Sequence, residues 1–426
     1  MGGGLLQLVA YGAQDVYLTG NPQITFFKVV YRRHTNFSLE AIEQTFNGTP
    51  TYGSRVTCQI SRNGDLINRA YLVVTLPTGV NFCNYIGLKL INYVEIEIGG
   101  QRIDRHYSQW LYIWNELSLP VSKKQGYFDM VGGAGGSFNA YNNVLHIPLE
   151  FWFCRNIGLS LPLIALQYHE VKINLNFEKG TALGNGTSDV SSNAFSASIW
   201  VDYVYLDTDE RRRFAQLSHE YLIEQLQFTG QESLNAQQSQ TSISIKQKLN
   251  FNHPTKELIW VIANSSGNND NWINFTTNNL SNSANISNSK NTYALVADAL
   301  KTKLITSSTV ASLNPTGTAK LVLNGNDRFA ERPGSYFNLI QPYQHHENIP
   351  NNAGINVYSF GLKPEEHQPS GTLNMSRIDT AVLNLTTSVL PSTTYYNYST
   401  TSIYVYAVNY NVLRILSGMG GLAYSN

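Results

Sequence analysis

The sequence predicts an all-β protein made of two similar domains. Strands with alternating apolar and polar residues recur along the chain, turn residues separate them, and one hairpin pattern occurs twice, about half the chain apart. A chain of 426 residues also exceeds the size at which one hydrophobic core usually keeps growing, so two domains are the default expectation. Many short strands with almost no sustained helical period favour a sandwich or barrel, of which the jelly roll is a common form.

The repeated hairpin lies at residues 94–103 and again at residues 321–329. Each copy is an alternating apolar run, a turn dipeptide, an Arg and a large apolar residue. The dipeptides Gly99-Gly100 and Asn324-Gly325 supply the positive φ angles of tight primed turns. The likeness covers only a few residues and such hairpins are common, so chance similarity stays open beside duplication of a whole domain.

Individual strands follow from period-two alternation. In residues 171–177, Val171, Ile173, Leu175 and Phe177 would face a core while the residues between them face solvent, as in a half-buried antiparallel strand. Further strands are expected at 69–76, 199–206, 242–251, 258–263, 382–387 and 402–410.

One short helix is expected at residues 207–215, with a capping box formed by Asp207 and Glu210. It would close the first domain. The resulting division is an N-terminal arm over residues 1–25, a first domain over 26–215, a linker over 216–241 and a second domain over 242–426.

Two segments are predicted to be long surface loops. Residues 126–143 are rich in glycine, and residues 264–291 are dominated by Asn, Ser and Thr. Neither can build a core of its own, whereas a rigid β scaffold tolerates such insertions because loop closure costs only about 0.6 kcal/mol per doubling of length.

The charge balance excludes a broad electrostatic surface. The chain has 29 Lys plus Arg against 29 Asp plus Glu, and 14% of its residues are charged. Such a surface does not attract nucleic acid or an anionic membrane. Arginines at 211–213 stand beside three acidic residues, which favours a solvated or inter-subunit salt-bridged face over nucleic-acid contact.

The cysteine count and the chain start indicate a reducing compartment. Cys58, Cys83 and Cys154 cannot all pair within the chain and match no zinc or redox spacing, so we expect free thiols. Neither a secretory signal nor a membrane-spanning run is recognised, and a soluble polypeptide without membrane insertion is predicted.

Catalytic and cofactor patterns fail on their context. Residues 418–423 match a dinucleotide fingerprint, but only three residues follow, so a flexible glycine-rich tail is the better interpretation. The pairs His345-His346 and His169-Glu170 lack metal-site spacing and are interpreted as surface or satisfied core residues. We therefore predict no catalytic residue, cofactor or metal ligand, and no enzyme activity.

Several blocks, in order along the whole chain, carry a family resemblance. They are GGLLQLVAYGAQDVYLTG at 3–20, ISRNGDL at 60–66, LPLIALQYHEV at 161–171, FNHPTK at 251–256 and NVLRILSGMGGLAY at 411–424. With these blocks the chain resembles the major capsid proteins of large icosahedral nucleocytoplasmic DNA viruses, especially those that infect algae. The loops at 126–143 and 264–312 depart from the family pattern.

The resemblance implies two tandem eight-stranded antiparallel jelly-roll barrels with short helices and long surface loops. It also implies a homotrimer whose six barrels form a pseudo-hexameric capsomer, and capsomers that tile the icosahedral outer capsid of a virion assembled in the host cytoplasm. The N-terminal arm would contact neighbouring capsomers or minor capsid proteins under the shell. Outer loops of the second barrel would meet the host surface and carry glycans, which makes Asn279, Asn285 and Asn397 glycosylation candidates.

Two other classes of function stay open at this stage. A jelly roll also serves as a lectin, in which exposed Tyr or Trp side chains stack on sugars. An enzyme on the same scaffold would need a metal or cofactor.

Overall fold

The computed structural model describes residues 13–14, 34–138, 143–234, 242–264, 269–276, 314–387 and 401–424. The chain divides into a short unit, Met1–Asn36, and the main unit, Phe37–Asn426, to which the following description applies. Apart from Ala13 and Gln14, the predicted N-terminal arm lies outside the described residues. None of the helices in the described ranges has both the length and the apolar character that a membrane crossing demands.

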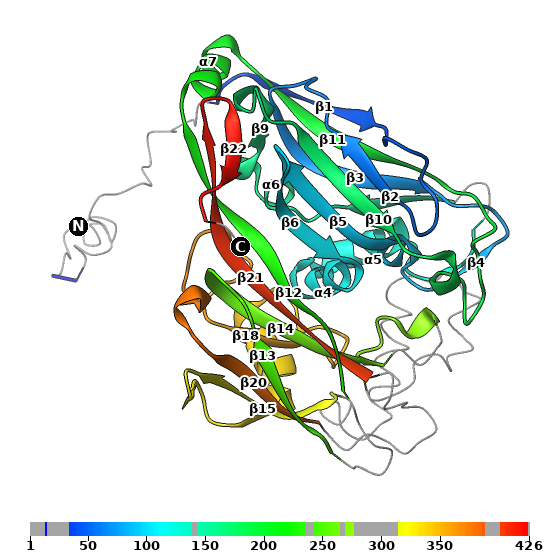
Figure 1. The fold of residues 1–426 in the computed structure, drawn as a ribbon, viewed down its shortest axis with the longest axis vertical. Helices are drawn as coiled ribbons and strands as arrows, with labels where there is room; N and C mark the ends of the chain where they lie inside the picture. The colour runs from blue at the N-terminus through cyan, green and yellow to red at the C-terminus, as the bar shows by residue number, and fades with distance from the viewer. Residues whose placement is uncertain are drawn as a thin grey trace, which may run out of the picture. The chain divides into compact units, whose positions relative to one another are not determined.

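The first half of the main unit consists of two antiparallel sheets (Figure 1). We call them the first A sheet and the first B sheet. The first A sheet has the strand order β1 (Phe37–Gln44), β11 (Ser196–Leu206), β3 (Leu66–Thr75), β8 (Val144–Pro148), with β9 (Leu161–Pro162) also paired to β3. The first B sheet has the order β2 (Arg55–Gln59), β10 (Val171–Phe177), β5 (Ile91–Ile98), β6 (Gln101–Tyr107).

The second half repeats this plan with a second A sheet and a second B sheet. The second A sheet has the order β12 (His219–Ser233), β21 (Thr401–Leu416), β14 (Pro254–Asn264), β18 (Asn356–Ser359), with β19 (Leu373–Asn374) and β22 (Met419–Leu422) added at its margins. The second B sheet has the order β13 (Ser244–Leu249), β20 (Ala381–Thr387), β15 (Thr316–Leu323), β16 (Asn326–Asp327), with β17 (Arg332–Pro333) paired to β15.

Both halves have the same connectivity. When the strands on these main paths are counted in chain order within each half, both A sheets run one-eight-three-six and both B sheets run two-seven-four-five. This is the jelly-roll arrangement of two Greek keys, so the predicted tandem jelly rolls are confirmed. The short strands β9, β17, β19 and β22 add to the eight strands per barrel that were expected.

The repeated hairpin marks equivalent positions in the two barrels. It is β5–β6 in the first and β15–β16 in the second, strands four and five of each path. The turn residues have positive φ as expected, 59° and 86° at Gly99 and Gly100 and 48° and 80° at Asn324 and Gly325. The likeness between the two segments therefore coincides with a repeat of the whole domain.

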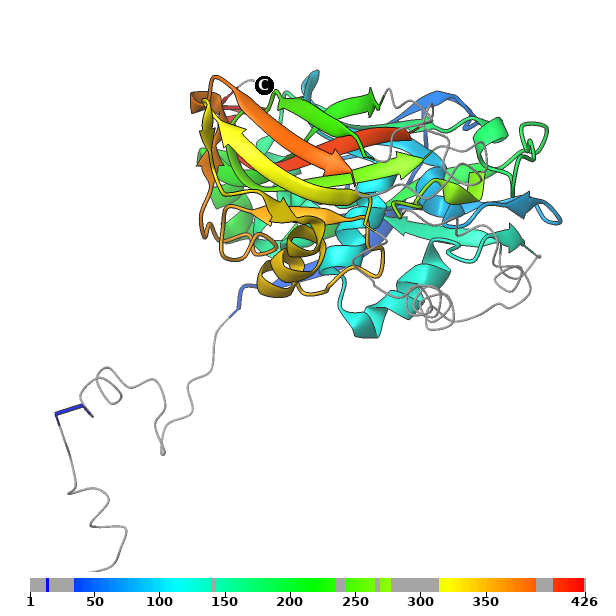
Figure 2. The same ribbon diagram turned by 90° about the horizontal axis from the view of Figure 1, so that it is seen from below.

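Helices fill the connection between strands five and six of each barrel. The first barrel has α4 (Ser108–Ser118) and α5 (Val121–Met130) there, and the second has the π-helix η7 (Tyr336–Ile340) and α9 (Gln341–His345), shown in cyan and gold in Figure 2. Helix α4 has no clear period in the sequence because residues 110–117 are buried around its whole circumference. The prediction of a loop over 126–143 is wrong at its start, since α5 runs to Met130 and Phe128 is buried.

Shorter elements complete the fold. They are β4 (Asn81–Phe82) paired with β7 (Gly136–Ser137), α3 (Ile86–Lys89), α6 (Trp152–Arg155), η1 (Ile157–Leu159), η2 (Leu163–Ala165), η3 (Gly180–Ala182), η4 (Asn269–Asn271) and η8 (Met375–Arg377).

The helix predicted at 207–215 is α7 (Thr208–Gln216). Asp207 caps it, although its Oδ1 accepts from the adjacent N–H of Thr208 at 2.8 Å. Glu210 pairs with Arg213 at 3.3 Å instead of completing a capping box. The expected linker over 216–241 is wrong for residues 219–233, which form strand β12, and residues 235–241 lie outside the described residues.

The turn of the second hairpin provides a test of the backbone argument. Gly325→Ala places a Cβ at φ 80° with no neighbour within 4 Å, so we expect a loss of about 1 kcal/mol of stability from strain alone. Gly126→Ala is the matched control, because Gly126 lies inside α5 with equally open surroundings and should gain up to about 1 kcal/mol from helix propensity. Urea denaturation measures the change in the free energy of unfolding in both variants. Changes of the same sign and size would contradict the requirement for positive φ at Gly325.

Candidate functional site

The central strands of the second A sheet, β14 and β21, are buried on both faces. Along β14, Leu258, Trp260 and Ile262 belong to the core of the second barrel. The residues between them belong to the hydrophobic cluster of the first barrel: Ile259, Val261 and Ala263. Since successive side chains of a strand point to opposite faces, one strand contributes to two cores.

Strand β21 behaves in the same way. Ile403, Val405 and Ala407 pack in the second barrel, while Tyr406 and Val408 join the cluster of the first. The two barrels are therefore joined by a continuous apolar junction. In Figure 1, β12 and β21 lie next to β6 and α4, the elements of the first barrel that face them.

Aromatic side chains fill the contact between α4 and the second A sheet. Trp110 of α4 packs on Tyr406 with ring centroids 5.5 Å apart, and Tyr107 packs on Phe228 of β12 at 4.9 Å. The hydroxyl of Tyr406 donates a hydrogen bond to Oε1 of Gln109 at 3.3 Å. The buried ring of Tyr406 thus keeps a partner for its polar end.

Hydrogen bonds fix the position of β12 against β6. Asp104 Oδ1 accepts from the backbone N–H of Leu226 at 3.0 Å, and the side-chain amide of Gln225 donates to the carbonyl oxygen of Ile103. Gln225 also accepts from Asn411 Nδ2 at 2.9 Å. These side chains are buried, so a displaced register would leave several of them without partners.

The segment that follows β14 also docks on the first barrel. Trp272 Nε1 donates to the carbonyl of Asn84 at 2.9 Å, and Asn269 Nδ2 donates to the carbonyl of Thr181 at 3.0 Å. In return, Lys89 Nζ donates to the carbonyl of Asn269 at 2.7 Å.

A buried ion cluster crosses the junction. Glu224 of β12 lies 2.7 Å from Lys256 Nζ, 3.1 Å from Nη1 of Arg155 on α6, and 3.7 Å from His367. Burial alone would raise the pKa of Glu224, but Arg155, His367 and Lys256 outweigh it and lower this pKa to about 2. The guanidinium of Arg155 also lies over the Trp114 ring at 4.8 Å, which anchors the cation in the first barrel.

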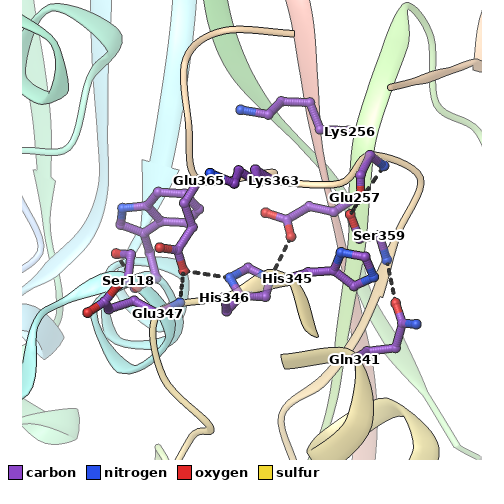
Figure 3. A network of polar contacts seen from close by, with 12 residues as sticks. Ser118, Lys256, Glu257, Gln341, His345, His346, Glu347, Ser359, Lys363 and Glu365 are labelled. Atoms are coloured by element: carbon purple, nitrogen blue, oxygen red, sulfur yellow. Dashed lines mark hydrogen bonds and ion pairs between the residues drawn. The ribbon is translucent and has the colours of Figure 1, made fainter. Parts of the chain in front are cut away.

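A second polar network surrounds His346 (Figure 3). Its Nδ1 is 2.7 Å from Glu365 and its Nε2 is 2.9 Å from Glu257, and the imidazole is fully buried. Burial alone would lower the pKa of His346, but the two carboxylates raise it to about 9, so the ring is charged at neutral pH. The neighbouring His345 instead bonds through Nδ1 to the carbonyl of Leu362 at 2.9 Å.

The loop after His346 caps helix α4. Asn348 Nδ2 lies 2.6 Å from the carbonyl oxygen of Leu119 and 3.2 Å from that of Leu117, and the Asn348 N–H donates to Leu117 at 3.0 Å. Carbonyls at a helix C-terminus have no partner inside the helix, so a loop of the second barrel satisfies an end of the first barrel's helix.

The C-terminal hairpin holds the opposite end of the junction. Strand β22 turns back along β21, and the carbonyls of Gly418 and Gly420 lie 2.9 Å from Tyr168 N and 2.8 Å from His169 Nδ1. A Cβ at Gly420 would come within 2.5 Å of the Leu166 side chain. The predicted flexible tail is therefore wrong, because these glycines serve close packing.

Other residues singled out in the sequence have structural contacts. Arg211 pairs with Asp65 of the same chain at 3.0 Å, and its side chain is more than half exposed. Cys58, Cys83 and Cys154 are free thiols as predicted, and burial raises each pKa to about 12. In the ranges that the structure describes, no three His, Cys, Asp or Glu side chains are placed to hold a metal ion. Asn279, Asn285 and Asn397 lie outside the described residues.

Sequence reasoning missed the junction. The residues Leu258–Ala263, with the sequence LIWVIA, lack the alternation of a half-buried strand. Such a continuous apolar run is typical of a strand that is buried on both faces, and it could have indicated the junction. Strand β12 was hidden because Glu224 and Gln225 look like surface residues while both are buried.

Comparison with known proteins adds independent information. Residues 25–207 match a family model described as major capsid protein N-terminus, and residues 210–421 match one described as large eukaryotic DNA virus major capsid protein. The major capsid protein of Pyramimonas orientalis virus is 52% identical over 457 residues, and that of Paramecium bursaria Chlorella virus 1 is 46% identical over 448 residues, with 100% of both chains covered in each case.

Solved structures agree with the sequence relatives. A quasi-atomic model of the PBCV-1 virus capsid is 40% identical, with a TM-score of 0.77 over 94% of this chain and 100% of that chain. The Faustovirus major capsid protein shares the fold at 12% identity, with a TM-score of 0.68 over 95% of this chain and 94% of that one.

The Glu224 cluster predicts a stability loss and an acid-sensitive transition. Glu224→Gln leaves the buried Lys256 and the half-buried Arg155 without their carboxylate, and we expect a loss of about 3 kcal/mol in urea denaturation at pH 7. The exposed pair of Glu220 and Arg414 gives the matched control, since Glu220→Gln should change stability by less than about 1 kcal/mol.

The same carboxylate sets a pH window. Because the pKa of Glu224 falls from 4.5 to about 2 on folding, its stabilisation is present above pH 4.5 and is lost as the pH falls toward 2. Glu224→Gln should lack this part of the acid destabilisation, and an unchanged acid slope in the variant would contradict the assignment.

His346 predicts the opposite dependence. Its pKa rises from 6.5 to about 9 on folding, so its stabilisation is complete below pH 6.5 and disappears as the pH rises through 9. The unmodified protein should have a lower melting temperature at pH 9.5 than at pH 6.5. This difference should be smaller in His346→Gln, whereas His345→Gln should keep it in full.

Proposed function

This chain belongs to the major capsid protein family of large eukaryotic DNA viruses, and from that premise we propose that three copies form a closed ring of six barrels, a pseudo-hexameric capsomer that tiles the icosahedral shell. It is a structural protein of the virion, not an enzyme. The alignments cover the chain from residue 25 to residue 421, with a gap of two residues between the two family models.

The junction is the observation that supports the proposal. Two barrels of the same connectivity are fixed to each other by a shared apolar core and by hydrogen bonds at both ends. A chain that already contains two equivalent units needs only threefold symmetry to give a nearly sixfold outline, and closed rings of this kind are the usual form of oligomers.

The composition suits contact between subunits. Only 14% of the residues are charged while 42% are hydrophobic, and several large apolar side chains are exposed on the single chain. Interfaces between permanently associated subunits are depleted of charge and enriched in aromatic residues. Association should therefore depend little on ionic strength.

Further partners follow from the same proposal. The N-terminal arm, residues 1–25, contacts neighbouring capsomers or minor capsid proteins beneath the shell. Asn279, Asn285 and Asn397 bear glycans, and outer loops of the second barrel meet the host surface. Assembly takes place in the host cytoplasm, which agrees with three free cysteines.

Light scattering coupled to size-exclusion chromatography tests the trimer. We expect a mass of three times 47.6 kDa, retained at about 1 M salt because apolar contacts are not screened. Hexagonal sheets seen by electron microscopy at higher concentration would support tiling. A mass of one chain at high protein concentration would overturn the proposal, and selective glycan binding by that single chain would favour a lectin.

A further inference from the structure

Because the two barrels have the same connectivity, the contact that joins them within one chain indicates which surfaces of each barrel are suited to contact. The helix between strands five and six of the first barrel, α4, lies on the outer face of the second A sheet. Its Trp110 packs on Tyr406, which belongs to β21, the eighth strand of the second barrel. One aromatic side chain from a helix thus meets an aromatic side chain on strand eight.

The equivalent helix of the second barrel presents an exposed apolar face. In the η7–α9 segment, the side chain of Tyr343 is 77% exposed and that of Ile340 is 44% exposed. Leu362, 71% exposed, lies next to this segment, since its carbonyl oxygen is 2.9 Å from His345 Nδ1. We call these three residues the α9 patch.

The equivalent sheet of the first barrel carries an aromatic row on its outer face. Trp200 of β11, the eighth strand, is paired in register with Tyr71 of β3, and their rings are nearly parallel at 6.5 Å. Tyr71 also lies 6.3 Å from the ring of His146 on β8.

An open cavity of about 480 Å³ lies on this face. Tyr71, His146 and Met130 line it together with the charged side chains of Arg69 and Asp202. Its size falls within the range of sites that enclose a sizeable group, and its mixed lining suits a side chain with an apolar ring and a polar end. Tyrosine has both properties.

We propose that Tyr343 of one copy inserts into this cavity on the first A sheet of a second copy, so that the contact between chains repeats the contact within the chain. The inference rests on the proposed three-copy ring and names the surfaces that close it. Each copy offers one α9 patch and one cavity, which is a head-to-tail contact, and such contacts form a ring when the rotation closes. Buried aromatic anchors carry most of the affinity in interfaces of this kind.

Two tyrosines of nearly equal exposure allow a matched test. Tyr343→Ala should weaken self-association at least tenfold, seen as a shift from the mass of three chains toward one in a light-scattering dilution series. Tyr168 lies beside the C-terminal hairpin, and its side chain is 74% exposed. Tyr168→Ala should leave unchanged the protein concentration at which the multimer dissociates. Circular dichroism of both variants confirms that each is folded.

Cross-linking locates the contact directly. His146→Cys and Tyr343→Cys, combined in a Cys154→Ser background because Cys154 also lines the cavity, should give covalent multimers on a denaturing gel under mild oxidation. Each single cysteine variant in that background should remain monomeric on the same gel.

The outcomes separate this inference from the proposed function. A wild-type mass of three chains that is unaffected by Tyr343→Ala, with no cross-link in the double variant, would overturn the α9 contact while leaving the trimer in place. A wild-type mass of one chain would overturn both.

Discussion

The second A sheet has to bury both of its faces, and the rest of the structure depends on this constraint. A sheet of an isolated jelly roll packs one face on its partner sheet and exposes the other. Here the outer face of β14 and β21 carries Ile259, Val261, Tyr406 and Val408, which are buried only because the first barrel covers them. The two barrels are therefore parts of one folding unit, and their relative orientation is a property of the core.

Apolar contact favours association of the barrels, and the polar groups determine the geometry of that association. A hydrophobic surface tolerates small rotations and shifts, whereas Asp104, Gln225 and Asn348 each have partners at one position only. Glu224 is the chain neighbour of Gln225 and His346 lies two residues before Asn348, and exposing or shifting their buried charged groups would cost free energy. A capsid protein, which assembles in many copies, needs this fixed geometry more than it needs additional stability.

Much of the fold could be predicted from the sequence, because period-two patterns and turn dipeptides are local. The alternation at Val171–Phe177, the α7 helix and the two equivalent hairpins were all found in this way. What could not be predicted depends on burial by the other barrel. Helix α4 is buried on all sides, Glu224 is a buried charge, and Gly420 is a glycine required for close packing. Each of these departs from what the same residues normally indicate in a single sequence.

Differential scanning calorimetry tests most directly whether the two jelly rolls form a single block. We expect one transition whose calorimetric enthalpy equals its van't Hoff enthalpy, because neither barrel can keep its core when the shared sheet is lost. Two separate transitions, with one barrel surviving the unfolding of the other, would contradict it.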